Sequence, residues 1–298
     1  MAHISVLLNE VIEIFDPKPG QHFIDATVGE GGHARAILQR TGPDGILLGI
    51  DKDERQIEFV RNELSIFGDR IILRQGSFSN IDTILKEMGG EQEMWDGILF
   101  DLGWVYMQVE ESQRGFSFNK DEILDMRYDT SRGLTAGDIL TKESPAYIEN
   151  ILREYSQERF AKSITAEVVK IRRKEPITRT LQLVNIVKSA TPLWYHHRRI
   201  HPATKTFQAL RIAVNNELNE LLQGIENALS FISENGKIVV ITFHSIEDGI
   251  VKRLFKEFQE RVNGRIGNKK PITASRLEQM LNPGARSAKL RTFIVGKA

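Results

Sequence analysis

The stretch HFIDATVGEGGHARAILQRTGPDGILLGID, residues 22–51, decides the fold class of this chain. It opens with a short apolar run over 22–27, followed by a glycine-rich loop and a segment, ARAILQR, with the spacing of a helix. A second apolar run, residues 45–51, ends in Asp51. Strands that are apolar along their whole length and alternate with helices are typical of a parallel sheet covered on both faces.

The same alternation continues along the first third of the chain and then stops. The pattern predicts four further strands, over 70–75, 96–103, 236–245 and 289–297. It also predicts helices over 53–68 and 81–88, a helical region through 144–174 and 178–192, and a long helical stretch over 206–232. We therefore predict an α/β, Rossmann-like fold with a helical insertion domain between the fourth and fifth strands. Residues 1–108 and 201–298 would form one discontinuous domain, and residues 109–200 the insertion.

Composition excludes several classes of protein. The chain has no cysteine, which rules out disulfides and thiolate catalysis, and no apolar run long enough to span a membrane. The acidic N-terminal segment lacks the basic lead of a signal peptide, so we expect a cytoplasmic protein.

Net charge is zero, with 40 basic and 40 acidic residues, but the charges are unevenly spread. Basic residues dominate residues 170–211, where Glu175 is the only acid, and also the segment after Lys252. Such segments are typical either of RNA binding or of solvated helix faces. We predict an RNA-facing patch formed by Trp194, Tyr195, His196, His197, Arg198, Arg199 and His201, and a mobile basic loop over 263–271. These histidines lack carboxylate companions, so we expect no metal site.

The glycine-rich loop predicts a cofactor site. Gly29, Gly31 and Gly32 lie between a strand and a helix, and Asp51 ends the next strand, where a carboxylate can accept hydrogen bonds from a ribose diol. Asp25 and Glu30 flank the loop; they would repel phosphate but suit a sulfonium, which favours S-adenosylmethionine over NAD. The alternative is a plain tight turn.

The fourth predicted strand ends in Asp101, followed by Leu102, Gly103 and Trp104. Amino-group methyltransferases commonly place an acid, two small or stiff residues and an aromatic here, because the acid can hydrogen-bond the amine and the ring can stack on a base. Alternatively, Trp104 and Tyr106 only pack beneath the insertion. The FHS sequence that contains His244 and Ser245 lacks the nucleophile elbow of a hydrolase.

In its ordered sequence motifs the chain resembles a known family, the bacterial small-subunit ribosomal RNA cytosine-N4 methyltransferases (RsmH, or MraW). The resemblance runs through the blocks HISVLLNEV (3–11), DATVGEGGH (25–33), GIDKD (49–53), GSFSN (76–80), DLG (101–103), RGFSF (114–118), LDMRYD (124–129), YSQERFAKSI (155–164), HPATKTFQALRIAVNNEL (201–218), FHSIED (243–248) and NPGARSAKLR (282–291).

The resemblance implies a cofactor, a substrate and a set of site residues. It implies that the small ribosomal subunit is the partner, that N4 of a cytidine is the methyl acceptor, and that S-adenosylmethionine is bound by Gly31, Gly32, His33, Asp51, Phe78, Asp101 and Gln108. Catalysis would rest on Asp101, with Trp104 and Tyr106 holding the base.

One loop departs from the family pattern. The family reads D-L-G-V-S-S-x-Q after the fourth strand, whereas this chain reads Asp101-Leu102-Gly103-Trp104-Val105-Tyr106-Met107-Gln108. The rings either stack on the cytosine or fill its pocket, so the alternatives are an active enzyme and a catalytically weakened ribosome assembly factor. A DNA or free-nucleoside amino methyltransferase is a third hypothesis. Both a monomer and a homodimer fit the sequence.

Overall fold

The computed structural model describes residues 5–89, 94–102 and 113–296. The chain divides into two compact units, Met1–Gly103 with Leu218–Ala298, and Trp104–Glu217. The sequence pattern predicts the second boundary at 200/201 instead. The structure differs there because helix α11 (Thr204–Asn215) packs on helices α6 and α7 of the second unit.

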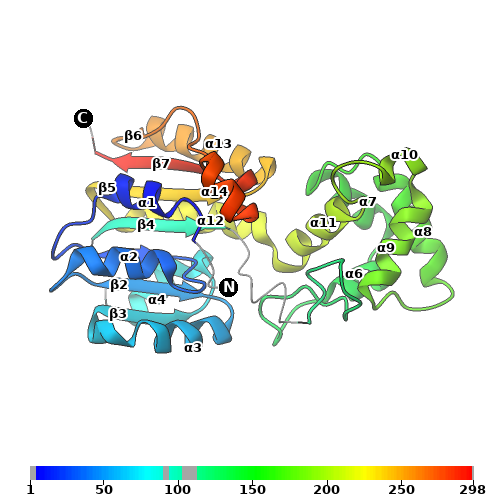
Figure 1. Ribbon diagram of the computed structural model, residues 1–298, viewed down its shortest axis with the longest axis horizontal. Coiled ribbons are helices and arrows are strands. Elements are labelled where there is room, and N and C mark those ends of the chain that lie inside the picture. Colours follow the sequence, from blue (N-terminus) through cyan, green and yellow to red (C-terminus); the bar gives the residue numbers. More distant parts are fainter. Residues whose placement is uncertain (1–4, 90–93, 103–112, 297–298) are drawn as a thin grey trace. The chain divides into compact units, whose positions relative to one another are not determined.

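The first unit is built on one seven-stranded sheet (Figure 1). Its strands are β1 (Phe23–Asp25), β2 (Leu47–Asp51), β3 (Ile71–Gln75), β4 (Trp95–Asp101), β5 (Ile232–Thr242), β6 (Gly264–Ile266) and β7 (Lys289–Val295). They lie in the order β3-β2-β1-β4-β5-β7-β6, and all neighbours pair in parallel except β7, which is antiparallel to β5 and β6. The predicted α/β class is confirmed. Chain order reverses between β1 and β4, and α/β proteins bind ligands beyond the carboxyl ends of strands at such a point.

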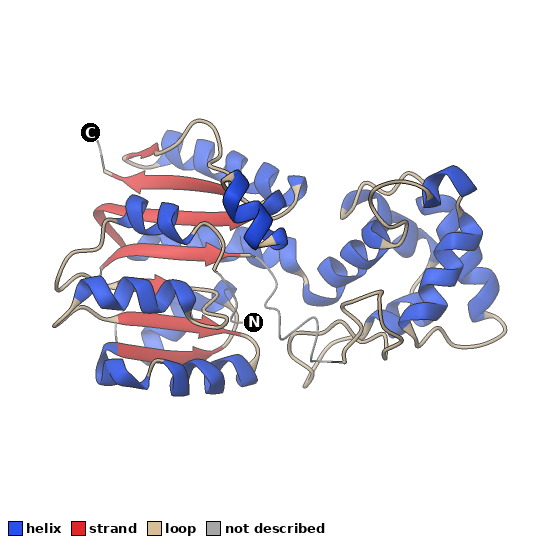
Figure 2. Ribbon diagram, in the orientation of Figure 1, coloured by secondary structure: helices blue, strands red, loops and turns tan. Residues whose placement is uncertain are grey.

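Helices cover both faces of this sheet (Figure 2). They are α1 (Leu8–Phe15), α2 (Gly32–Thr41), α3 (Glu54–Glu63), α4 (Ile81–Glu87), α12 (Glu217–Ala228), α13 (Ser245–Arg261) and α14 (Arg276–Leu281). Successive residues of β4 point to opposite faces: Phe100 packs with α4, α12 and α13, whereas Leu99 packs with α1, α2 and α3. Two buried layers explain why the strands are continuously apolar.

Two predictions about the second half of the chain are wrong. The helical stretch expected over 206–232 is interrupted by Asn216, whose left-handed backbone (φ 51°) ends α11 before α12 begins. The segment 263–271 is not the expected mobile loop but includes edge strand β6. Asn268 fixes the segment, since its Oδ1 accepts from the Thr292 amide at 2.7 Å and its Nδ2 donates to the Leu290 carbonyl at 2.9 Å.

The second unit is helical and has its own apolar core. Its helices are α6 (Ala136–Lys142), α7 (Pro145–Glu154), α8 (Ala161–Arg172), α9 (Thr180–Ala190), α10 (Leu193–His196) and α11. Ser144 caps α7 and Thr135 closes a capping box on α6, which fixes where these helices begin. Ile151, Val168 and Leu183 are among the residues that fill the core. Among the helices described, none is long and apolar enough to cross a membrane.

Candidate active site

The loop between β1 and α2 turns on two glycines with left-handed backbone. Gly29 has φ 50° and Gly31 has φ 79°, values that a residue with a side chain adopts only at a cost. At Gly31 an added Cβ would also crowd Leu64 and Val60, at 3.2 and 3.3 Å. Glycine is therefore required at Gly31 both by its backbone conformation and by the lack of space for a Cβ. These glycines carry no side chain of their own over the backbone at the carboxyl edge of the sheet.

Asp51 holds this loop to the end of β2. Its Oδ2 accepts from the Gly29 amide at 3.1 Å and its Oδ1 from the Asp53 amide at 2.9 Å. Burial raises the pKa of Asp51 to about 6, against the opposing effect of the two amides. Each carboxylate oxygen has a second lone pair, so Asp51 can accept hydrogen bonds from a diol while it holds the loop.

Asp101 and His33 meet beside the same loop. The Asp101 amide donates to Thr27 Oγ1 at 2.7 Å, which ties the end of β4 to the loop after β1. His33 Nε2 lies 3.4 Å from Asp101 Oδ2. The His33 side chain is buried, and neither ring nitrogen has a hydrogen-bond partner within the described structure. Buried polar atoms without a hydrogen bond are rare, so these two nitrogens are candidates for contact with a ligand.

Asp25 adds a third carboxylate beneath this site. It is 1% exposed, and its pKa is raised to about 7, first by burial and then by the neighbouring charges of Asp101 and Asp51, whereas His33 acts in the opposite direction. Three acids around one loop make the edge unfavourable for phosphate and favourable for a cationic ligand.

Phe78 forms part of the apolar floor next to the site. It follows β3, and its ring meets that of Phe100 edge-on at 5.5 Å. Gly224 of α12 packs so closely that an added Cβ would overlap the Phe78 ring. The structure thus brings Gly31, His33, Asp51 and Asp101 together at the carboxyl edge and places Phe78 at the end of the adjacent strand. Trp104, Tyr106 and Gln108 lie outside the described residues.

A family model described as the MraW methylase family matches residues 1–295. The chain belongs to this family. The chain is 44% identical to ribosomal RNA small subunit methyltransferase H of Syntrophotalea carbinolica, with 98% of this chain and 97% of that protein covered. It is also 44% identical to the protein of the same name from Geobacter sulfurreducens, with 97% of each covered. The predicted family is confirmed.

Similarity to solved structures is weaker. TrmN from Thermus thermophilus aligns with a TM-score of 0.47 and 9% identity, covering 97% of this chain and 48% of that one.

A polar network that no sequence motif predicts lies beside the candidate site of this MraW family member. Ser77 Oγ donates to Glu220 Oε2 at 2.9 Å, and Lys52, the residue after Asp51, forms an ion pair with the same carboxylate. Glu220 lies on α12, far along the chain, and no motif spacing connects it to Lys52. Only the packing of α12 on the sheet brings the two together.

His244 has a structural role that its sequence context left open. Its Nδ1 accepts from the Glu247 amide at 3.3 Å, while Glu247 accepts from the Phe243 and His244 amides at 2.8 and 3.2 Å. These bonds form a capping box at the start of α13. The hydrolase hypothesis has no support from this geometry.

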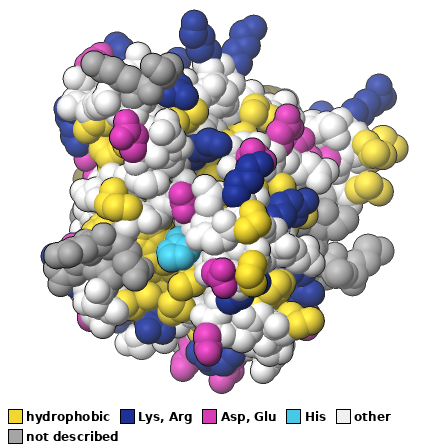
Figure 3. Space-filling model, turned by 90° about the vertical axis from the view of Figure 1, so that its left-hand side faces the viewer, with side chains coloured by type: hydrophobic (Ala, Val, Ile, Leu, Met, Phe, Trp, Pro, Cys, Tyr) yellow, Lys and Arg dark blue, Asp and Glu magenta, His cyan; other side chains and the backbone are white. Residues whose placement is uncertain are grey.

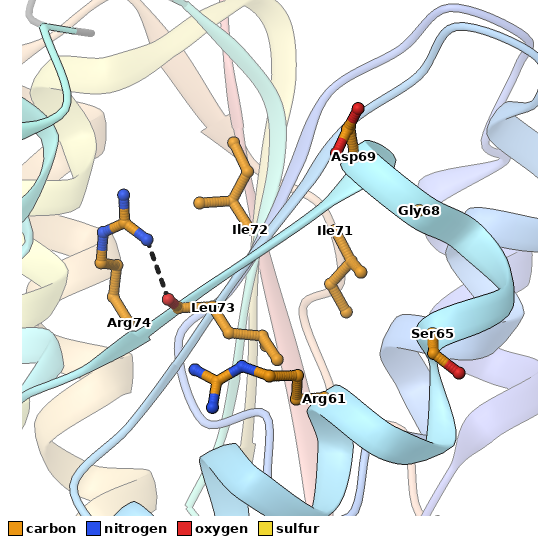
Figure 4. A pocket seen from close by; sticks show the side chains of 8 residues that line it. All are labelled: Arg61, Ser65, Gly68, Asp69, Ile71, Ile72, Leu73 and Arg74. Atoms are coloured by element: carbon orange, nitrogen blue, oxygen red, sulfur yellow. Dashed lines mark hydrogen bonds between the residues drawn. The ribbon is translucent and has the colours of Figure 1, made fainter.

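Two other surfaces of the first unit are weaker candidates for a functional site. A shallow pocket of about 550 Å³ lies along edge strand β3, between Arg61 of α3 and Arg74 (Figure 4). Its lining comes from 61–74 and includes none of the residues of the candidate site. The face that Figure 3 shows mixes basic and acidic side chains, so it presents no continuous surface of one sign to a polyanion.

Proposed function

We propose that this chain methylates the exocyclic N4 amine of a cytidine in small-subunit ribosomal RNA, with S-adenosylmethionine as methyl donor. Its membership of a methylase family favours an enzyme over a non-catalytic assembly factor. The names of its relatives support small-subunit ribosomal RNA as the substrate and hence the small subunit as the partner. We expect the reaction in the cytoplasm, where small subunits assemble.

The single observation that carries the proposal is the meeting of Asp101 and His33 at the end of β4. A buried imidazole at the start of α2, whose nitrogens have no hydrogen-bond partner among the described residues, lies 3.4 Å from a carboxylate and directly follows the glycines of the loop. This arrangement fits a ligand that offers hydrogen-bonding groups and positive charge.

The residues present fit S-adenosylmethionine. Gly31, Gly32 and His33 would lie against the amino-acid part of the donor, Asp51 would accept from the ribose hydroxyls, and Phe78 would border the adenine. Gln108 would add a further contact. The three carboxylates compensate the positive charges of a sulfonium and an ammonium, and no pyrophosphate has to be accommodated. When bound, S-adenosylmethionine supplies an electrophilic methyl group.

Asp101 would act on the amine of the cytosine. The N4 lone pair is delocalised into the ring, and an N–H···O bond to Asp101 restores part of its density. The Thr27 hydroxyl accepts from the Asp101 amide, which holds the backbone that carries the acceptor before the base arrives. Trp104 and Tyr106 would stack on a base taken out of its helix. The methylated nitrogen carries an acidic proton, which passes to solvent, so no dedicated base is needed.

The test is to incubate the chain with methyl-labelled S-adenosylmethionine and small subunits that lack the modification, and to map the product by mass spectrometry. We expect a single cytidine to gain one methyl group on N4. Asp101→Asn should lower the rate more than 100-fold, on the order of 3 kcal/mol in activation free energy. Asp69→Asn, on the exposed surface, is the matched control. Label on another base or ring atom, or no label in RNA, would contradict the proposal.

A further inference from the structure

An exposed aromatic surrounded by arginines lies at the short helix α10 of the second unit. We define the α10 platform as Arg159, Leu193, Trp194, His197, Arg198 and Arg199. Trp194 is 52% exposed and Leu193 75% exposed, and the other members are also exposed. Two large apolar side chains facing water among cations need an explanation beyond folding.

The Trp194 ring is held in one orientation by its neighbours. Its centroid lies 5.9 Å from that of Phe160 and 5.8 Å from that of Tyr195, with interplanar angles of 59° and 89°. The Arg159 guanidinium lies 5.8 Å from the centre of the indole. A ring fixed in this way loses little conformational entropy when it binds a partner.

Tyr195 serves as the support rather than as a second stacking surface. It is 4% exposed, and its hydroxyl donates to Glu158 Oε2 at 2.8 Å. Its ring also packs edge-on against Phe160 at 4.9 Å. The expectation that both Trp194 and Tyr195 face RNA is therefore wrong for Tyr195, because burial in the second unit removes its faces from solvent.

The cations of the platform are not neutralised by neighbouring acids. Arg159, Arg198 and Arg199 form no ion pair with any described carboxylate, and the acid next to Arg159, Glu158, is 3% exposed and bonded to Tyr195. Other arginines of the same unit are paired, as Arg153 is with Glu149 at 2.7 Å. The platform thus combines a fixed ring with uncompensated positive charge, which is the combination that single-stranded nucleic acid recognises.

We propose that the α10 platform binds an unpaired nucleotide of the substrate RNA, distinct from the cytidine that is methylated. Trp194 stacks on the base, and Arg159, Arg198 and Arg199 contact the flanking phosphates. This inference rests on the proposed function, because it assumes that the chain acts on RNA. A protein partner is disfavoured, since four of the six platform residues are Arg or His, and the large exposed apolar side chains there are Leu193, Trp194 and, next to the platform, Ile200.

The test compares binding and methylation by Trp194→Ala, Trp194→Phe and the double variant Arg198→Gln/Arg199→Gln. The controls are Leu181→Ala, also an exposed apolar residue of the unit, and Arg153→Gln, a paired arginine. We expect Trp194→Ala to raise the Kd for protein-free small-subunit RNA roughly tenfold, within the range for loss of one stacked base. Trp194→Phe should retain most of the affinity, and the arginine double variant should flatten the salt dependence by about two ion equivalents.

Several readouts separate this inference from the proposed function. Methylation by Trp194→Ala should show a higher KM for RNA with kcat and the Kd for S-adenosylmethionine unchanged, and ultraviolet crosslinking should join Trp194 to RNA. If the Trp194 and arginine variants bind RNA as tightly as the wild type, and the wild type methylates RNA, then the proposal for the α10 platform is wrong and the proposed function stands. Weaker binding to whole subunits but not to protein-free RNA would also overturn it, in favour of a ribosomal protein as partner. Failure of the wild type to methylate would instead refute the proposed function.

Discussion

Buried acids at the carboxyl edge of the sheet lower the stability of the free protein when they ionise. Asp25, Asp51 and Asp101 surround one loop, and the pKa values of Asp25 and Asp51 are raised to about 7 and about 6, mainly by burial. A carboxyl group buried without a cation favours its neutral form, so the free protein resists ionising these groups. A bound cationic ligand would instead favour the ionised form of these carboxyl groups.

Asp25 contributes to the pH dependence of stability in the same direction as Asp51, whose pKa is also raised. The pKa of Asp25 is about 7 in the folded chain against 3.8 for the unfolded reference, so between these values the folded state binds more protons than the unfolded state. The free energy of unfolding therefore falls as pH rises through this window, by on the order of 4 kcal/mol in total for this group alone. We expect Asp25→Asn to flatten the decline between pH 4.5 and 8 in chemical unfolding. The control Asp44→Asn, on the exposed surface, should leave this decline unchanged. If the free energy of unfolding of Asp25→Asn falls with pH as steeply as that of the wild type, the assignment to Asp25 is refuted.

His33 gives a second test at this scale. Because its ring nitrogens have no hydrogen-bond partner in the described structure, removing the ring breaks no hydrogen bond in the free protein. We expect His33→Asn to weaken S-adenosylmethionine binding at least tenfold by calorimetry while the cofactor-free Tm changes little. His197→Asn, on the exposed α10 platform, is the control. Equal affinities in the two variants would exclude His33 from the site.

At the scale of elements, the packing of α12 on the sheet determines the shape of the floor. Gly224 lets this helix approach Phe78, whereas Gly249 of α13 has open space where a Cβ would be. Both are helix-interior glycines, and the sequence does not distinguish them. They differ only in their surroundings: Gly224 packs against the Phe78 ring, whereas Gly249 faces open space.

These two glycines make a matched pair of substitutions. Gly249→Ala should raise the free energy of unfolding by up to about 1 kcal/mol, since alanine is the better helix former. Gly224→Ala should instead lower it by about 1–3 kcal/mol and weaken cofactor binding, because the new methyl displaces the Phe78 ring. Denaturant unfolding and calorimetry measure both effects. Two stabilised variants would show that α12 does not press on Phe78.

Element boundaries show where sequence patterns suffice. The apolar strands were predictable because both faces of the sheet are covered, which leaves a continuous apolar run. Edge strand β6 was not, since its three residues, Gly264–Ile266, have intermediate burial and depend on pairing with β7. Asn216 was also missed, because its left-handed conformation within an otherwise helical pattern has no periodic signal.

At the scale of the whole molecule, a net charge of zero conceals a local excess of positive charge. Arg159, Arg198 and Arg199, which pair with no described carboxylate, belong to the second unit, while the acidic loop residues belong to the first. Affinity for RNA should therefore fall steeply with salt, by more than tenfold between 50 and 200 mM. Affinity for S-adenosylmethionine should change by less than about threefold over the same range, because its charges meet partly buried groups. Filter binding and calorimetry provide the two measurements, and a flat RNA curve would contradict the assignment.

The amino-acid pattern predicts most of the strands and helices in their order, the glycine loop, the acids at the strand ends and the family, because each of these depends on local spacing or on ordered motifs. Packing in three dimensions places His33 beside Asp101, pairs Glu220 of α12 with Lys52, and buries Tyr195 while Trp194 stays exposed. Periodicity reports only which face of an element is apolar. Partners distant in sequence, and the burial of one ring rather than its neighbour, depend on how separate elements pack together.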